Sequence, residues 1–210
     1  MNELVTYRDD GPLATWLSRL VGNSPAVSAS APLVTLAGGI VLVGSLVALG
    51  QGIGLLAPTV GVIGYVLLAG GVAGRDLTGR LDWLVPPMLR AAEYATLLVL
   101  ALLAEPTEPG AVPACFLILA VLAYNHYNIT YRLRHQNAVP PRWLRYVGGG
   151  WDVRLLVAFA LFAVGWLAIG MYVLSGVLAV LHIVETVISW SRGTQGYSGA
   201  VHDEEEDDAE

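Results

Sequence analysis

Three ionisable side chains lie inside apolar segments of the sequence and could do acid–base chemistry: Glu93, His126 and Glu185. A carboxylate or an imidazole within hydrogen-bond reach of a substrate can take up or release a proton during a reaction. Such groups are costly in hydrocarbon, so the few found in apolar segments commonly mark a functional site. We therefore treat these three residues as candidate catalytic residues.

Each candidate also has a structural interpretation. Glu93 follows an arginine by three positions, which allows a local ion pair on one helix face. His126 could simply hydrogen-bond a neighbouring helix. His182 and Glu185 have the same spacing of three, and could pair with each other or with Arg154. The residues alone leave these interpretations open.

The candidates are expected at one depth in a membrane. At about 1.5 Å per residue, Glu93 and His126 lie about 9 Å inside the expected edge of their segments, and Glu185 lies about 7–8 Å inside. Three helices with polar groups at one level predict a polar cavity that opens to the cytoplasm. Further polar side chains of the same regions are supporting candidates: Asp82, Asn125, Asn128, Asp152 and His182. The pattern identifies neither a metal nor a cofactor.

Four arginines of the same regions are candidates for binding anionic headgroups or phosphate: Arg80, Arg132, Arg134 and Arg154. The stretches 74–83 and 142–154 combine arginines with glycines. Glycines expose backbone N–H groups, and arginine binds phosphate through two parallel hydrogen bonds. The alternative is that these arginines only mark the cytoplasmic side of a membrane protein. The sequence contains no P-loop and no HExxH motif beside them.

The elements that must position these residues are transmembrane helices. Of the 210 residues, 55% are hydrophobic and 13% are charged, whereas a soluble domain carries about 25% charged residues. Six apolar segments are each about long enough to cross a hydrocarbon core of about 30 Å. We predict them at residues 32–49, 53–73, 83 or 87 to 104, 112–131, 151–174 and 176–190, with the last two joined at Ser175-Gly176. The sequence thus predicts an all-α, six-transmembrane-helix bundle, a multi-pass protein of the plasma membrane, whose glycine-rich faces would allow a homo-oligomer.

Two segments flank the predicted membrane domain of residues 32–191. Residues 1–31 form an N-terminal segment with an amphipathic helix over 12–22, in which Leu13, Trp16 and Leu20 share one face. We expect this helix to lie in the membrane interface, and a helix packed on the rest of the protein is the alternative. Residues 192–210 form a tail with seven acids in the last eight positions, which we expect to be disordered.

The distribution of arginine predicts the orientation. All 11 arginines lie in or beside the N-terminal segment, the second–third connection, the fourth–fifth connection or the tail. The connections at 50–52, 105–110 and 175–176 contain none. By the positive-inside rule, both termini are cytoplasmic. Basic residues this sparse and this close to the membrane make nucleic acid an unexpected partner.

Four longer stretches carry a family resemblance. They read YRDDGPLA (7–14), GRLDWLVPPMLRAAEY (79–94), YNHYNITYRLRHQ (124–136) and PPRWLRYVGGGWDVRLLVA (140–158). Together they resemble an uncharacterised family of actinobacterial integral membrane domains, over roughly residues 5 to 192. Relatives in that family occur fused to, or beside, CDP-alcohol phosphotransferase modules. The resemblance therefore implies a role in phospholipid or phospho-polyol metabolism, with a CDP-alcohol phosphotransferase-like protein as a partner.

The sequence departs from the pattern of that family at two points. Residues 125–128 read Asn-His-Tyr-Asn where the family has His-His-Tyr-Asp, and Val153 stands where a small residue is expected. The chain is not itself a CDP-alcohol phosphotransferase, because the acids and arginines of 74–83 lack the spacing of the DxxDGxxAR motif of those enzymes.

Three functions stay open. The chain is a non-catalytic membrane subunit or scaffold that binds anionic lipid headgroups on its cytoplasmic face, a membrane enzyme that acts on a phosphorylated lipid or polyol, or a small transporter. Catalysis requires the side chains of Glu93 and His126, a scaffold tolerates their loss, and a transporter needs a path to the far side. The missing acid at Asn128 favours the scaffold.

Overall fold

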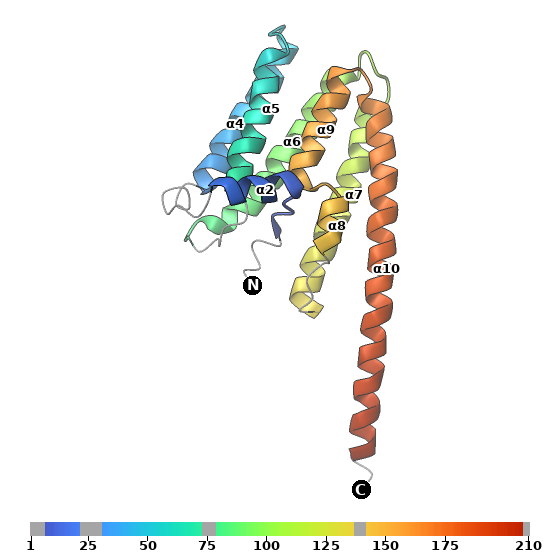
Figure 1. Ribbon diagram of the computed structural model, residues 1–210. Helices are drawn as coiled ribbons and strands as arrows, with labels where there is room; N and C mark the ends of the chain where they lie inside the picture. The colour runs from blue at the N-terminus through green and yellow to red at the C-terminus, as the bar shows by residue number, and fades with distance from the viewer. Residues whose placement is uncertain (1–6, 22–30, 73–78, 137–141, 208–210) are drawn as a thin grey trace.

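The computed structural model describes residues 7–21, 31–72, 79–136 and 142–207, and all secondary structure in these ranges is helical. Side chains are described up to 191, except at 21, 135, 136, 142 and 145. Six longer helices run side by side in alternating directions (Figure 1). They are α4 (Ala31–Gly50), α5 (Leu56–Gly71), α6 (Val85–Ala104), α7 (Ala111–Tyr131), α9 (Gly150–Ala163) and α10 (Leu167–Asp207). The shorter elements are α2 (Pro12–Val21), η1 (Asp82–Leu84), the π-helical turn η2 (Arg132–Gln136) and α8 (Arg142–Val147).

The two ends of the bundle differ in composition. The basic end carries α2, η1, η2 and α8, together with the first turns of α4, α6 and α9 (Figure 1). The distal end carries the loops 51–55, 105–110 and 164–166. The described arginines belong to segments at the basic end, and the distal loops contain none. The fold thus keeps the separation of charge that the sequence predicts.

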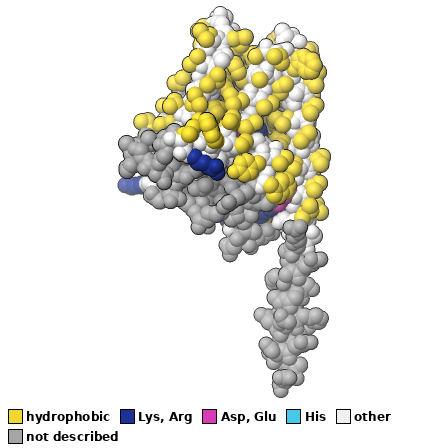
Figure 2. All heavy atoms as spheres, in the orientation of Figure 1, with side chains coloured by type: hydrophobic (Ala, Val, Ile, Leu, Met, Phe, Trp, Pro, Cys, Tyr) yellow, Lys and Arg dark blue, Asp and Glu magenta, His cyan; other side chains and the backbone are white. Residues whose placement is uncertain are grey.

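Four helices in the described ranges are long and apolar enough to cross a membrane: Ala31–Gly50, Asp82–Ala104, Ala111–Arg134 and Leu167–Ser191. The helix α5 is apolar but has only 16 residues, which corresponds to about 24 Å. Figure 2 shows apolar side chains over most of the bundle surface, with the visible charged side chains toward the basic end. So much exposed apolar surface would be unstable in water, and it indicates a helical membrane protein.

The predicted turn at Ser175-Gly176 is wrong. The chain reverses earlier, over residues 164–166, where Gly165 has a φ of 75° and the Trp166 N–H donates to the Leu161 carbonyl over 2.9 Å. This is a Schellman motif, which favours glycine because the left-handed region costs it nothing. Ser175 lies inside α10, and its hydroxyl donates to a backbone carbonyl one turn earlier over 2.5 Å. Residues 167–174 therefore belong to the last helix.

The two flanking segments follow the sequence analysis in part. The predicted helix over 12–22 is present as α2, which crosses the basic end against α5 and α9 (Figure 1). Residues 22–30, the expected linker, lie outside the described residues. At the other terminus, α10 continues to Asp207 and extends past the neighbouring helices, where the sequence analysis expects disorder from 192. Adding residues to an existing helix costs little, because the unfavourable step is nucleation.

Candidate functional site

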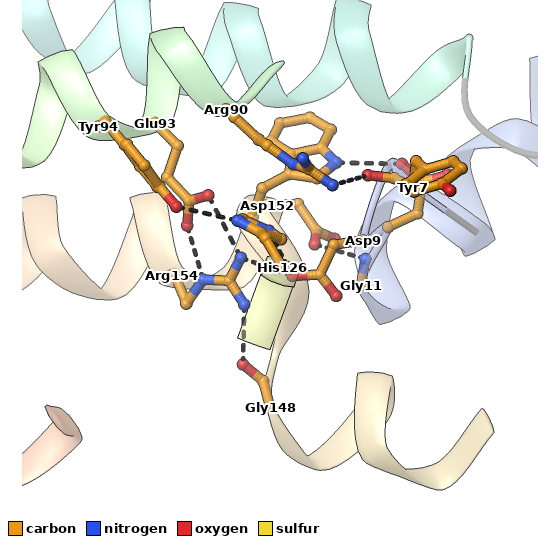
Figure 3. A network of polar contacts seen from close by, with 12 residues as sticks. Tyr7, Asp9, Gly11, Arg90, Glu93, Tyr94, His126, Gly148, Asp152 and Arg154 are labelled. Atoms are coloured by element: carbon orange, nitrogen blue, oxygen red, sulfur yellow. Dashed lines mark hydrogen bonds and ion pairs between the residues drawn. The ribbon is translucent and has the colours of Figure 1, made fainter. Parts of the chain in front are cut away.

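Asp9 lies at the centre of a buried polar cluster at the basic end (Figure 3). Its φ of 56° is in the left-handed region, which aspartate tolerates better than most residues. Its Oδ2 accepts a hydrogen bond from Arg154 Nη2 over 2.8 Å and lies 3.9 Å from His126 Nε2. Burial is the largest single influence on this carboxyl and opposes its ionisation, but the charge and hydrogen bond of Arg154 and the nearby imidazoles of His126 and His182 together outweigh it and hold the pKa of Asp9 below its usual value.

Arg154 joins Asp9 to Glu93. Its Nε donates to Glu93 Oε1 over 2.6 Å and its Nη2 lies 3.3 Å from Glu93 Oε2, so both carboxylate oxygens are engaged (Figure 3). Glu93 is only 1% exposed. A carboxylate that is buried this deeply needs a charged, hydrogen-bonding partner to be stable. The local pair of Glu93 with Arg90 is not formed, because Arg90 instead donates to the Tyr7 carbonyl over 2.8 Å.

His126 completes the cluster from α7. Its Nδ1 lies 2.9 Å from the Tyr94 hydroxyl, and the two rings stack with centroids 6.1 Å apart. When the hydroxyl donates to Nδ1, the ring proton is on Nε2, the nitrogen that faces Asp9. The helices α6, α7 and α9 thus direct Glu93, His126 and Arg154 toward one segment of chain that precedes α2.

The first turn of α9 holds this segment by hydrogen bonds to its backbone. The Gly11 N–H donates to Asp152 Oδ1 over 2.9 Å, and the Ala14 N–H donates to Asp152 Oδ2 over 2.6 Å. Asp152 therefore caps the N-terminus of α2 from another helix, where orphan N–H groups favour a carboxylate. Gly11 lies so close to Gly150 that a Cβ on either residue would overlap the backbone of the other chain segment.

Two further contacts hold the same segment from the side. Arg8 donates to the Val72 carbonyl over 3.2 Å and forms an ion pair with Asp10 over 2.8 Å. The Trp151 Nε1–H donates to Asp10 Oδ1 over 3.0 Å. We call residues 8–11 with Glu93, His126, Asp152 and Arg154 the N-terminal clamp. Every side chain of the clamp is buried.

The second predicted glutamate belongs to a separate pair. Glu185 on α10 accepts two hydrogen bonds of 2.7 Å from Arg132 on η2, one on each oxygen. Nearby, Asn128 Nδ2 donates to the Thr186 hydroxyl over 2.8 Å. These contacts join α7 to α10 along a polar seam. Glu185 and Glu93 are therefore each bound by a different arginine.

Residues 1–209 match DUF5941, a family of unknown function. The chain belongs to the DUF5941 family. No match was found among curated proteins or among solved structures.

The remaining predicted site residues of this DUF5941 chain take separate places. Arg80 and Arg134 are exposed, unlike Arg132 and Arg154. Asp82 accepts a hydrogen bond of 2.8 Å from the Gly79 N–H and so closes a turn before η1. Other predicted polar groups are buried on α7 and α10: Asn125, Asn128 and His182. Within the described residues, no three metal-ligating side chains lie close enough together to hold a metal ion.

Sequence reasoning missed the part of the DUF5941 clamp that precedes α2. A depth in the membrane can be estimated only for residues inside apolar segments. Arg8, Asp9 and Asp10 lie in a polar stretch outside those segments. The available signal was the stretch YRDDGPLA, whose acids, glycine and proline directly precede the amphipathic helix. An acidic pair at that point is suited to a partner arginine inside the bundle.

Proposed function

We propose that this protein is a non-catalytic scaffold or subunit of the membrane, which binds anionic lipid headgroups at its basic end. We place this end on the cytoplasmic side and all six longer helices across the membrane. The observation that carries the proposal is the engagement of both candidate glutamates: each of Glu93 and Glu185 has both oxygens bound by an arginine of another helix. A carboxylate in such a pair is enclosed and has both oxygens bound, which suits a structural role better than proton transfer.

The core beyond the clamp supports this choice over a transporter. Toward the distal end, the buried side chains between the helices are mostly apolar, among them Leu97, Leu100, Ile118, Leu122 and Met171, and the buried polar residues Thr96 and Ser175 are uncharged. A transport pathway needs polar groups or water along its whole length. In the described residues, the polar cluster occupies one level and the apolar core continues beyond it.

The exposed groups at the basic end support lipid binding. Arg80 and Arg134 are exposed, and Arg19 lies on the exposed surface of α2. On the same helix, Trp16 is 56% and Leu20 is 65% exposed. An amphipathic helix with exposed tryptophan, leucine and arginine fits the boundary between headgroups and acyl chains. The clamp would hold α2 in this plane.

The proposed lipid ligand also fits the resemblance noted in the sequence. A scaffold beside a CDP-alcohol phosphotransferase-like enzyme would hold that partner close to its anionic lipid substrates or products. We propose this partnership as part of the same function. It rests on the resemblance of residues 7–14, 79–94, 124–136 and 140–158.

Native mass spectrometry of the full chain tests lipid binding. The protein is released from micelles that contain equal amounts of phosphatidylglycerol and phosphatidylcholine, and the retained lipids are counted. We expect preferential retention of phosphatidylglycerol, and a clear loss of this preference in the Arg80→Gln/Arg134→Gln double variant with an unchanged Tm. Gln51→Ala at the exposed distal loop is the matched control. Equal retention of the two lipids by the wild type would contradict the proposal.

A further inference from the structure

The clamp and lipid binding leave three nitrogens of two buried imidazoles unexplained: both ring nitrogens of His182, and Nε2 of His126. His182 is 3% exposed and His126 is 6% exposed. Neither ring nitrogen of His182 has a hydrogen-bond partner in the described part of the chain, and the same holds for Nε2 of His126. Buried polar atoms in native proteins nearly always have a partner, either protein or ordered water. Three such nitrogens in one region point to a bound molecule.

The fold brings the two imidazoles to the same level. The helices α7 and α10 both run from the distal end to the basic end (Figure 1), and the Asn128–Thr186 hydrogen bond fixes their register. His126 precedes Asn128 by two residues, and His182 precedes Thr186 by one turn. His126 also faces the segment before α2, with its Nε2 3.9 Å from Asp9 Oδ2. Polar groups from α7, α10 and the segment before α2 therefore converge.

We infer that ordered water occupies a buried site between α7 and α10, where it bonds the imidazoles of His126 and His182 and links them to the Asp9 carboxylate. The His126 Nε2 to Asp9 Oδ2 distance of 3.9 Å is too long for a direct hydrogen bond. One water molecule can bond both atoms. Buried waters typically have about three protein partners, a number that the two imidazoles and the carboxylate supply.

Other occupants fit the site less well. A metal ion is disfavoured, because no three metal-ligating side chains of the described residues lie close enough together. An added anion would meet the carboxylates of Asp9 and Glu93, and an added cation would meet the guanidinium of Arg154. Water carries no charge and can donate to a neutral imidazole or accept from it. Such a water would also give the buried Asp9 carboxylate a further hydrogen-bond donor.

Hydroxyl-radical footprinting by X-ray radiolysis tests this site in the full-length protein. Radicals formed from a bound water modify the side chains beside it, even when those side chains are shielded from bulk solvent. We expect His126 and His182 to be modified more than Met171, which is buried on the same helix as His182, although a thioether is intrinsically more reactive than an imidazole. Cys115, also buried, is a second control. Modification of Met171 and Cys115 without the histidines would overturn the inference.

A pair of variants gives an independent readout. His182→Leu removes both nitrogens and keeps a similar volume. If these nitrogens bond water, the variant removes one of the three partners of that water and the Tm falls, whereas His182→Gln restores part of the loss. If the ring nitrogens of His182 bond nothing, not even water, their burial costs free energy and His182→Leu removes that cost. His182→Leu then has an unchanged or higher Tm, and this result would contradict the inference. Neither result bears on phosphatidylglycerol retention, so this inference and the proposed function can fail separately.

Discussion

Arg154 and Glu93 are 61 positions apart in the sequence, and their side chains meet over 2.6 Å in the interior of the bundle. Through its Nη2, Arg154 also binds Asp9 over 2.8 Å. One guanidinium thus ties α6 and α9 to the segment that leads into α2. The geometry accounts for three charged residues that are all buried in a membrane protein.

Removing this guanidinium should destabilise the protein strongly. We expect Arg154→Met to lower the free energy of unfolding by about 3–5 kcal/mol, because two carboxylates then stay buried without a partner. Adding Glu93→Gln and Asp9→Asn to this variant should recover part of the loss. Thermal unfolding in detergent micelles measures the effect. The exposed Arg134→Met variant is the matched control, with an expected change within about 0.5 kcal/mol; equal effects at both positions would contradict a structural role for Arg154.

The close approach of Gly11 and Gly150 should not tolerate a side chain. At Gly150 the φ of 59° alone makes alanine costly, by about 1–2 kcal/mol, and its Cβ would also overlap the Gly11 backbone. We therefore expect Gly150→Ala and Gly11→Ala to lower the Tm and to expose residues 8–21 to proteases. Gly44→Ala is the matched control, since open space surrounds that position and alanine favours a helix. Unchanged proteolysis in Gly150→Ala would argue against the observed packing.

Glu105 should make stability depend on pH. The N–H groups of Val112 and Gly110 donate to its carboxylate over 2.6 and 3.1 Å, and these bonds hold the pKa of Glu105 below its usual value. Because the pKa is lower in the folded state, the stabilisation is fully present above the pKa of the unfolded chain. It is lost as the pH falls through the folded pKa. The Tm difference between wild type and Glu105→Gln should therefore be largest near pH 7 and shrink toward pH 3; a constant difference would exclude this linkage.

Cysteine labelling tests the corrected position of the last turn and the proposed orientation. In a Cys115→Ala background, Val164→Cys and Thr107→Cys should react with a membrane-impermeant maleimide added to intact cells. Ser175→Cys should not react, because Ser175 is buried inside α10. Val147→Cys, exposed at the basic end, should react only after the membrane is permeabilised. Labelling of position 175 but not 164 would restore the turn expected from the sequence.

Hydropathy was sufficient to predict where most of the helices lie. The segments expected at 32–49 and 112–131 coincide with α4 and α7 almost to the residue, because long apolar runs between turn residues have few alternatives in a membrane. Hydropathy did not predict the position of the last turn. Ser-Gly at 175–176 and Gly165 are equally acceptable turn signals, and the choice depends on packing that hydropathy does not contain. One such contact is the Ala168 N–H, which donates to Glu108 of another loop over 3.0 Å.

The sequence predicts the depth of the candidate site in the membrane, but not which charged side chains form ion pairs there. The depth estimate puts Glu93, His126 and Glu185 at one level, and in the structure Arg154, Asp9 and Tyr94 connect the first two, whereas Glu185 binds Arg132. Which arginine binds which glutamate depends on helix rotation and on contacts between distant segments. A single sequence contains no information on that pairing. Asp9 was missed because it reaches the site from a polar segment, through a left-handed backbone turn.

Hydrogen–deuterium exchange of α2 is the most direct measurement of the central claim, which is that the buried charges hold the N-terminal segment in place. The full chain is compared in lipid nanodiscs as wild type, Asp9→Asn and the exposed-site control Arg134→Gln. The account predicts that exchange in residues 12–21 accelerates at least about tenfold in Asp9→Asn, as expected for the loss of about 1.4 kcal/mol or more of local stability, and stays at the wild-type rate in the control. Unchanged exchange in α2 of a folded Asp9→Asn protein would contradict it.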